Sequence, residues 1–293
     1  MNQGFARLKF PAALFGVLLL LFHISAVVEG VRGALTVCAV SIIPSLFVFM
    51  IAADLTVTLT AGDTCGLPPK YAVFLLGALC GFPIGAVVCE RMTASGALSK
   101  EDAARLLPFT NNASPAFVIG AVGGMLGDRR LGVFICVSQI LASLLFLLPI
   151  RVKHRAFAPS AVQVPIGDAF FSAVDAAVRS ILRISALICL FSALLAVLRT
   201  YLHAPLFYAA LAALLEIGSG TSFCASLFPS APFAAVALCA FACGWSGICV
   251  HLQILASLKS VKVNRLRLLL CKAAQGLLTT FFAMIGCKFL FGY

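Results

Sequence analysis

Polar and small residues stand at four points where apolar segments of the sequence stop. These interruptions are residues 81–85 (GFPIG), 110–115 (TNNASP), 216–222 (EIGSGTS) and 244–247 (GWSG). Inside a bilayer an unpaired backbone N–H or C=O group is costly, so such a break needs protein or water around it. Each break also starts a new helical segment, whose free N–H groups and dipole favour negative charge. The pattern favours a binding site for a small polar solute within a membrane.

The candidate binding residues are the residues of these breaks and one glutamine that follows the last of them. Asn111 and Asn112 each offer hydrogen-bond donors and acceptors. Glu216 follows an uninterrupted apolar run, where an ionisable side chain either carries a proton or cation or caps a helix. The predicted solute-binding set is Gly81, Pro83, Gly85, Thr110, Asn111, Asn112, Ser114, Glu216, Ser219, Thr221, Gly244, Trp245, Ser246 and Gln253.

A purely structural interpretation of the same breaks is also open. Glycine and proline are common in membrane helices, and small residues let neighbouring helices approach closely. Serine and threonine at a break can serve only as helix caps, and the single tryptophan, Trp245, can serve only in packing. Four breaks in matching order, two of them with Asn or Glu, favour a site.

The elements that hold these breaks are apolar runs long enough to span a bilayer. Hydrophobic residues make up 62% of the 293 residues and charged residues only 11%, against roughly 25% charged in water-soluble proteins. Several runs reach the roughly 20 residues that a helix needs to cross the hydrocarbon. The runs are residues 11–28, 34–59, 131–150, 184–198 and 268–285. The chain is therefore predicted to be an integral membrane protein.

The order of runs and breaks predicts an all-α polytopic membrane protein with two pseudo-repeated halves. Each half has full-spanning helices and interrupted or re-entrant helical segments. Residues 1–32 are predicted to form an N-terminal transmembrane helix and a short loop, and residues 33–150 the first repeat. Residues 151–183 are predicted to form a basic loop and an amphipathic helix along the interface, and residues 184–293 the second repeat.

The net charge of +11 would suggest nucleic-acid binding in a soluble protein, but here the basic residues stand in short loops between apolar runs. That is the distribution of cytoplasmic loops under the positive-inside rule. It predicts a lipid bilayer, and no nucleic acid, as the partner, with these loops and the N-terminus in the cytoplasm. The basic blocks are Arg7 and Lys9; Arg151, Lys153 and Arg155; and Lys259, Lys262, Arg265 and Arg267.

Metal, redox and enzyme chemistry have little support in the sequence. Most of the twelve cysteines are scattered singly through apolar stretches, where free Cys packs as a small hydrophobe. No CxxC pair, H-E-x-x-H, G-x-S-x-G or phosphate-binding loop is present. We therefore expect no metal site, no cofactor and no enzymatic activity.

Four motifs together carry a family resemblance, over residues 31–289. They are IPSLF at 43–47, GFPIG at 81–85, LLPFTNNASPAF at 106–117, and GWSG at 244–247 with Gln253. In these motifs the chain resembles the YlbJ (SpoVV) family of sporulation integral membrane proteins, which belongs with the nucleoside-recognition "gate" domain proteins. The resemblance implies a spore-forming bacterium. It also implies carriage of dipicolinic acid from the mother cell towards the forespore, across the outer forespore membrane.

The leading hypothesis is a transporter or facilitator of a small organic anion, with dipicolinate as the solute that the resemblance implies. Its site would lie between the two halves and be built from the four breaks. A nucleoside or cation carrier of the gate-domain type is one alternative. A non-transporting membrane scaffold for spore development is the other, and it predicts that the breaks pack dry against neighbouring helices.

Overall fold

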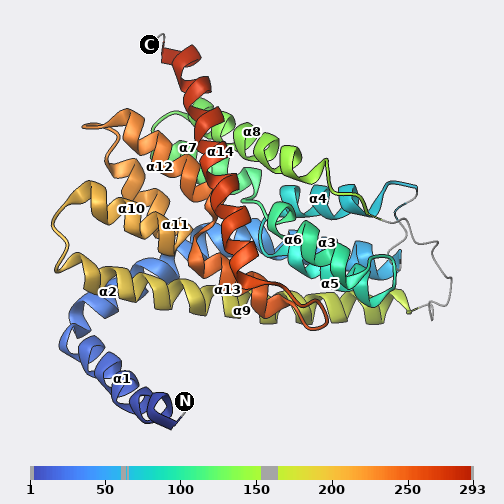
Figure 1. Cartoon of the computed structure of the whole chain (residues 1–293), viewed down its shortest axis with the longest axis horizontal. Helices are drawn as coiled ribbons and strands as arrows, with labels where there is room; N and C mark the ends of the chain where they lie inside the picture. Colours follow the sequence, from blue (N-terminus) through green and yellow to red (C-terminus); the bar gives the residue numbers. More distant parts are fainter. Residues whose placement is uncertain (1–2, 61–63, 65, 153–163, 292–293) are drawn as a thin grey trace.

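The computed structural model of the chain describes residues 3–60, 64, 66–152 and 164–291. In these ranges every regular element is a helix, which confirms the predicted all-α fold (Figure 1). The helices before residue 151 are α1 (Gln3–Phe22), α2 (Ile24–Val37), η1 (Cys38–Ile42), α3 (Ile43–Leu59), α4 (Pro69–Cys80), α5 (Ile84–Ala94), α6 (Lys100–Thr110), η2 (Ala116–Val122), α7 (Gly123–Met125) and α8 (Arg129–Leu147). Those after it are α9 (Ile166–Arg199), α10 (Pro205–Leu215), α11 (Ile217–Ser226), α12 (Pro232–Trp245), α13 (Gly247–Ser257) and α14 (Arg265–Phe291).

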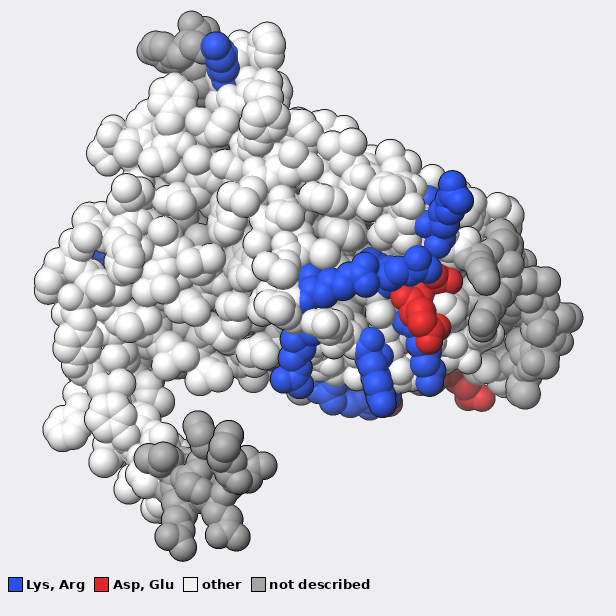
Figure 2. All heavy atoms as spheres, in the orientation of Figure 1, with Lys and Arg blue, Asp and Glu red and all other residues white. Residues whose placement is uncertain are grey.

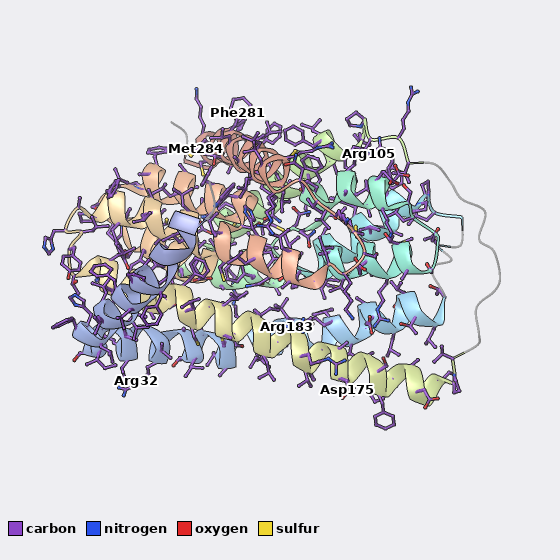
Figure 3. The ribbon with its side chains drawn as sticks, turned by 60° about the horizontal axis from the view of Figure 1, so that its bottom comes forward. Arg32, Arg105, Asp175, Arg183, Phe281 and Met284 are labelled. Carbon is purple, nitrogen blue, oxygen red and sulfur yellow. The ribbon has the colours of Figure 1, made fainter. Side chains whose placement is uncertain are left out.

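Several described helices are long and apolar enough to cross a membrane. There are four such spans by length and composition: α8, α9, α12 with α13, and α14; the bent pair α1–α2 would make a fifth. Large apolar side chains are exposed along these helices, for example Phe281 of α14 at 59% exposure (Figure 3). Such a surface is stable against lipid and not against water. The protein is an integral membrane protein, as predicted.

The short loop predicted before residue 33 is helical instead, and the domain boundary at residue 32 stays a prediction. The first apolar run bends by 85° between α1 and α2, and α1 stands away from the helical body (Figure 1). Residues 29–32, predicted as a loop, lie inside α2. The reason is packing: a Cβ at Gly30 would lie 2.7 Å from the backbone oxygen of Ser192, so Gly30 allows α2 to press against α9 rather than ending the helix.

The helix end expected at residue 183 is also absent, and the domain boundary there stays a prediction. A separate interfacial helix was expected to end there, but α9 runs unbroken from Ile166 to Arg199. No Gly or Pro interrupts its backbone hydrogen bonds around Arg183. At 1.5 Å per residue its length is about 51 Å, more than a ~30 Å hydrocarbon core requires. One helix therefore serves both as membrane span and as its extension beyond the hydrocarbon.

All four predicted interruptions are present as helix ends. Gly81 takes a positive φ of 84° after α4, and Asn111 turns to an extended conformation after α6. Glu216 is extended between α10 and α11, and Ser246 is left-handed with φ 75° between α12 and α13. The equivalence of the two halves as repeats stays a prediction.

Basic residues gather towards one end of the face shown in Figure 2. Lys70 donates to the backbone oxygens of Leu148 and Ile150, and Arg105 donates to that of Arg151. These bonds hold the end of α8 beside the ends of α4 and α6, as expected if they share one side of the membrane. The side chains of Arg7 and Lys9, and residues Lys153 and Arg155, lie outside the described part of the structure.

Candidate functional site

The four breaks pack against each other in two pairs. In the first half a Cβ at Gly85 would lie 2.0 Å from the backbone oxygen of Thr110, so the break at 81–85 touches the break at 110–115. In the second half a Cβ at Gly247 would lie 3.1 Å from the backbone oxygen of Leu215, so the break at 244–247 touches the break at Glu216. Each half therefore brings its two interruptions together at one place.

A small buried cavity lies where the two pairs of breaks meet. Its volume is about 30 Å³, enough for about one or two water molecules. Of the predicted residues, Gly81 and Ser114 line it from the first half, and Glu216 and Gln253 from the second. The Oε1 atom of Gln253 has no hydrogen-bond partner there, and the side chain is 4% exposed. Three of the four breaks therefore line this inner cavity, and the helix that begins at the fourth break, α13, lines it with Gln253.

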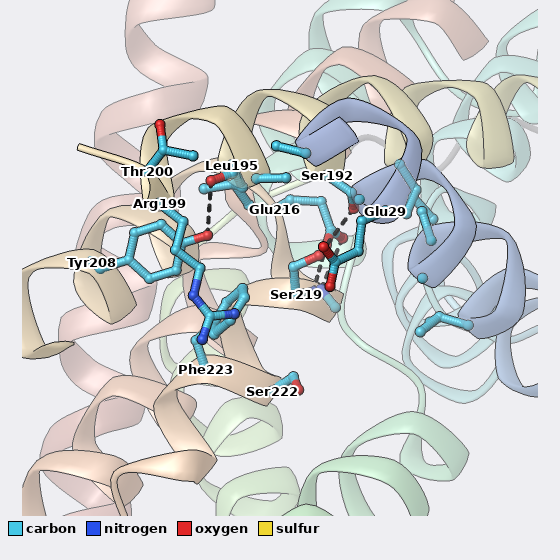
Figure 4. A pocket seen from close by; sticks show the side chains of 18 residues that line it. Glu29, Ser192, Leu195, Arg199, Thr200, Tyr208, Glu216, Ser219, Ser222 and Phe223 are labelled. Carbon is cyan, nitrogen blue, oxygen red and sulfur yellow. Dashed lines mark hydrogen bonds between the residues drawn. The ribbon is translucent and has the colours of Figure 1, made fainter. Parts of the chain in front are cut away.

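A larger cavity of about 570 Å³ lies next to it, between α2, α9, α10 and α11 (Figure 4). That volume is in the usual range for small-molecule sites. Glu216 and Ser219 are its only residues from the predicted set. Sequence reasoning missed Glu29, Arg199 and Tyr208. Glu29 and Arg199 directly follow the apolar runs 11–28 and 184–198 and were regarded as ends of spans, although an ionisable group beside a span is a functional candidate where it faces the protein interior.

Glu216 lines both the inner cavity and the larger one. The side chain is 1% exposed. Its Oε1 accepts a hydrogen bond of 2.8 Å from the N–H of Gly218, and its Oε2 one of 2.5 Å from the N–H of Ser219. Ser219 also shares a hydroxyl hydrogen bond of 3.0 Å with Ser192 of α9. Glu216 is therefore the N-cap of α11, one of the two roles expected from the sequence.

This cap corrects one part of the sequence hypothesis. The N–H groups at the start of α11 were expected to be free for an anion, but the carboxylate of Glu216 occupies two of them. At the start of α5 the N–H of Ala86 is likewise bonded, at 3.0 Å, to Oδ1 of Asn111. Side chains of the protein thus satisfy the helix starts that a solute was expected to use, because buried N–H groups need a partner in every state.

Asn111 and Asn112 belong to a buried hydrogen-bond network and line neither cavity. Gln275 of α14 donates at 2.7 Å to Oδ1 of Asn112 and at 2.7 Å to Oγ of Ser143. Gln139 of α8 donates at 3.0 Å to the backbone oxygen of Ala113. The break at 110–115 is therefore held on two sides by side chains from α8 and α14.

Lys272 is the charged member of this network, and the sequence prediction missed it. The side chain is fully buried, and its Nζ donates at 3.1 Å to the backbone oxygen of Asn111 and at 3.0 Å to Oε1 of Gln275. In the described part of the chain no carboxylate pairs with it. Lys272 lies inside the apolar run 268–285, and treating that run as uniformly apolar hid the signal.

The other predicted residues of the second half have local partners. Thr221 donates to the backbone oxygens of Ile217 and Gly218 within its own helix. Trp245 donates from Nε1 to the backbone oxygen of Leu214 at 2.9 Å. The hydroxyl of Ser246 donates to the backbone oxygen of Cys243. Gly244 packs against α14, because a Cβ at this position would lie 2.8 Å from Cα of Gly276.

The remaining predicted residues of the first half are Pro83, Gly85 and Thr110. Pro83 follows a cis peptide bond and precedes α5. Gly85 packs against Thr110, whose hydroxyl bonds to the backbone oxygen of Leu106. These residues shape the paired breaks without lining either cavity.

Comparison with known proteins shows sequence similarity to a sporulation protein. No protein-family model matches the chain, and no solved structure matches it. It is 24% identical over 263 aligned residues to "Sporulation integral membrane protein YlbJ" of Bacillus subtilis (strain 168), which covers 74% of this chain and 63% of that protein. The match therefore spans less than two thirds of the relative's length. The resemblance that the GFPIG and FTNNASP motifs indicated is confirmed: this integral membrane protein is similar to YlbJ.

Proposed function

We propose that the protein transports a small organic anion across its membrane. The observation that carries the proposal is an inner cavity lined by three helix breaks and by Gln253 of α13, the helix that begins at the fourth break. This cavity shares Glu216 with a cavity of about 570 Å³. Interrupted helices that meet near the midplane are the usual architecture of a transporter site. A site between two halves can be opened to one side and then to the other by rocking one half against the other.

Dipicolinate is the solute that we propose, with the outer forespore membrane as the location. Support comes from the similarity to a sporulation integral membrane protein. It comes also from the GFPIG and FTNNASP motifs of this chain, which carry the family resemblance. The larger cavity offers a guanidinium, Arg199, and two aromatic rings, Tyr208 and Phe223, to a flat aromatic acid. It also holds Glu29 and Glu216, so a dianion would need a compensating proton or cation.

The test is uptake of labelled dipicolinate by proteoliposomes that contain the purified protein. Wild-type vesicles should accumulate the label faster than empty vesicles. Glu216→Gln should reduce the initial rate by about tenfold or more, because glutamine cannot hold the proton or cation that compensates the dianion. Glu101→Gln is the matched control, because Glu101 is exposed on α6 and lines neither cavity. Equal uptake in empty and protein-containing vesicles would contradict the proposal.

A non-transporting scaffold remains the competing function, and one observation favours it. Asn111 and Trp245 pack against protein and line neither cavity, as the scaffold hypothesis expects of a dry break. A complementation experiment in a sporulating host distinguishes the two functions. A scaffold predicts that Glu216→Gln restores sporulation to a strain that lacks the protein, whereas a transporter predicts that it does not. Competition by unlabelled nucleosides, or uptake of a cation alone, would instead identify a carrier of another solute.

A further inference from the structure

We infer that Arg199 is the residue that selects planar carboxylates at the mouth of the transport route. This assignment rests on the proposed function and deepens it, because it names the group that recognises the solute. Arg199 is absent from the candidate set that the sequence supplied, and none of the four breaks contains it.

Three cavities lie in series, and Arg199 stands at the first junction. A cavity of about 260 Å³ at the start of α10 and the end of α11 shares Arg199, Tyr208 and Phe223 with the 570 Å³ cavity. The 570 Å³ cavity in turn shares Ile188 and Glu216 with the inner cavity. A solute that enters beside the α9–α10 connection therefore meets Arg199 first and Glu216 second.

The guanidinium of Arg199 is free to bind a carboxylate. Its contact is the ring of Phe223, whose centroid is 5.2 Å from the guanidinium carbon. Among the described residues it forms no ion pair. A guanidinium presents five N–H donors in a planar fork that matches a carboxylate bidentately. The contact with the ring of Phe223 uses none of these donors.

The neighbouring aromatic residues form a fixed wall beside the guanidinium. The hydroxyl of Tyr208 donates to the backbone oxygen of Leu195 at 2.9 Å, which anchors the ring to α9. The rings of Tyr208 and Phe223 meet edge to face with centroids 4.8 Å apart. A flat acid can therefore lie along an aromatic surface while its carboxylate meets Arg199. The class of ligand that this junction fits is a planar, preferably aromatic, carboxylate.

The larger cavity is polarised along its length. Figure 4 shows Arg199 beside Tyr208 and Phe223, whereas Glu29 lies beside Ser219 and Glu216. An anion is thus attracted at the Arg199 end and repelled at the Glu216 end, so recognition belongs to Arg199. The mouth lies at the C-terminal end of α9, about 50 Å along that helix from Ile166.

A simpler role for Arg199 makes a different prediction. A basic residue in the last turn of a helix favours the negative end of the helix dipole, and any cation there would serve. Under that role Arg199→Lys behaves as the wild type. Under selection by the planar fork, lysine replaces only the charge and loses the bidentate geometry.

The test compares Arg199→Gln and Arg199→Lys with Arg183→Gln, the matched control on the same helix; Arg183 is exposed and lines none of the three cavities (Figure 3). In dipicolinate uptake by proteoliposomes, we expect Arg199→Gln to raise KM by about tenfold or more. Arg199→Lys should raise it by a smaller factor, and Arg183→Gln should leave it unchanged. An unchanged KM in Arg199→Gln, or wild-type kinetics in Arg199→Lys, would overturn the assignment.

Calorimetric binding of dipicolinate to the purified protein separates this assignment from the proposed function. If the wild type binds but does not transport, the proposed function fails, and weaker binding by Arg199→Gln than by Arg183→Gln still supports the assignment. Binding that is equal in all variants, or absent from the wild type, overturns it. Thermal unfolding of each variant shows whether Arg199→Gln is folded; since Arg199 is exposed, we expect an unchanged midpoint.

Discussion

The breaks at 110–115 and at Glu216 have the same kind of sequence but different surroundings. The first is enclosed by α8 and α14, and Gln139, Ser143, Lys272 and Gln275 bond to its backbone and side chains. The second lies between two cavities, and its only carboxylate is bonded within its own helix start. A polar break in a membrane helix can therefore be either a locked structural joint or a site.

The difference follows from where the partners of each break come from. The Asn111–Ala113 segment is held by residues more than a hundred positions further along the chain, such as Lys272 and Gln275. The carboxylate of Glu216 accepts hydrogen bonds from the N–H groups of Gly218 and Ser219, which are near neighbours in the sequence. A break that depends on other helices cannot open without unpairing buried groups, whereas a self-capped break can face a cavity. Four substitutions test this contrast, in order of the expected loss of folding stability.

Gly85→Ala should have the largest effect, namely loss of the folded protein. A Cβ at this position would lie 2.0 Å from the backbone oxygen of Thr110. The overlap involves backbone on both helices, so no flexible side chain can move to relieve it. We expect a cost of at least about 3 kcal/mol, at the upper end for overpacking. Size-exclusion profiles and thermal unfolding in detergent measure it. Gly124→Ala is the control, because no atom lies within 4 Å of the added Cβ; equal behaviour of the two variants would show that the paired breaks are loosely packed.

Gln275→Leu should destabilise the protein by about 3 kcal/mol, because it leaves the Lys272 ammonium, Asn112 and Ser143 short of partners in a buried site. The measurement is the midpoint of thermal unfolding. The double variant Lys272→Met/Gln275→Leu should recover part of the loss, since replacing Lys272 by an apolar residue removes the unpaired charge. If the unfolding midpoint of the double variant did not recover, the hydrogen-bond network would stabilise more of the fold than the break at 110–115.

Asn111→Ala should lower stability by about 2 kcal/mol, because the buried N–H of Ala86 loses its acceptor. Since Asn111 lines neither cavity, the folded fraction should take up dipicolinate with an unchanged KM. The outcome that favours the original sequence hypothesis is the reverse one: unchanged thermal stability with a raised KM would make Asn111 a solute contact.

Glu216→Gln should have the smallest effect on stability, about 1 kcal/mol, because glutamine keeps one oxygen to cap α11. Its effect on uptake should nevertheless exceed that of Asn111→Ala. Measuring unfolding and initial uptake rates on the same preparations checks both. If Glu216→Gln unfolds as readily as Gln275→Leu, the two breaks are equally structural and the contrast between them fails.

Membrane residence, helical class and the positions of the breaks were predictable from the sequence, because they depend on local composition and on Gly, Pro and capping residues. The continuation of helices through residues 32 and 183 was not predictable, because close packing of α2 on α9 and the unbroken bonding of α9 overrode the local signals.

Only the tertiary structure decided which polar residues lie close together in space. Lys272 bonds to Asn111 across 161 positions of sequence, and Arg199 meets Glu29 and Glu216 around one cavity through the packing of α2, α9 and α11. Hydropathy and spacing describe each helix separately, whereas a site is formed by the faces that different helices turn towards each other. The sequence therefore determined that the helices are interrupted, and the packing decided which break is bonded to other helices and which lies between two cavities.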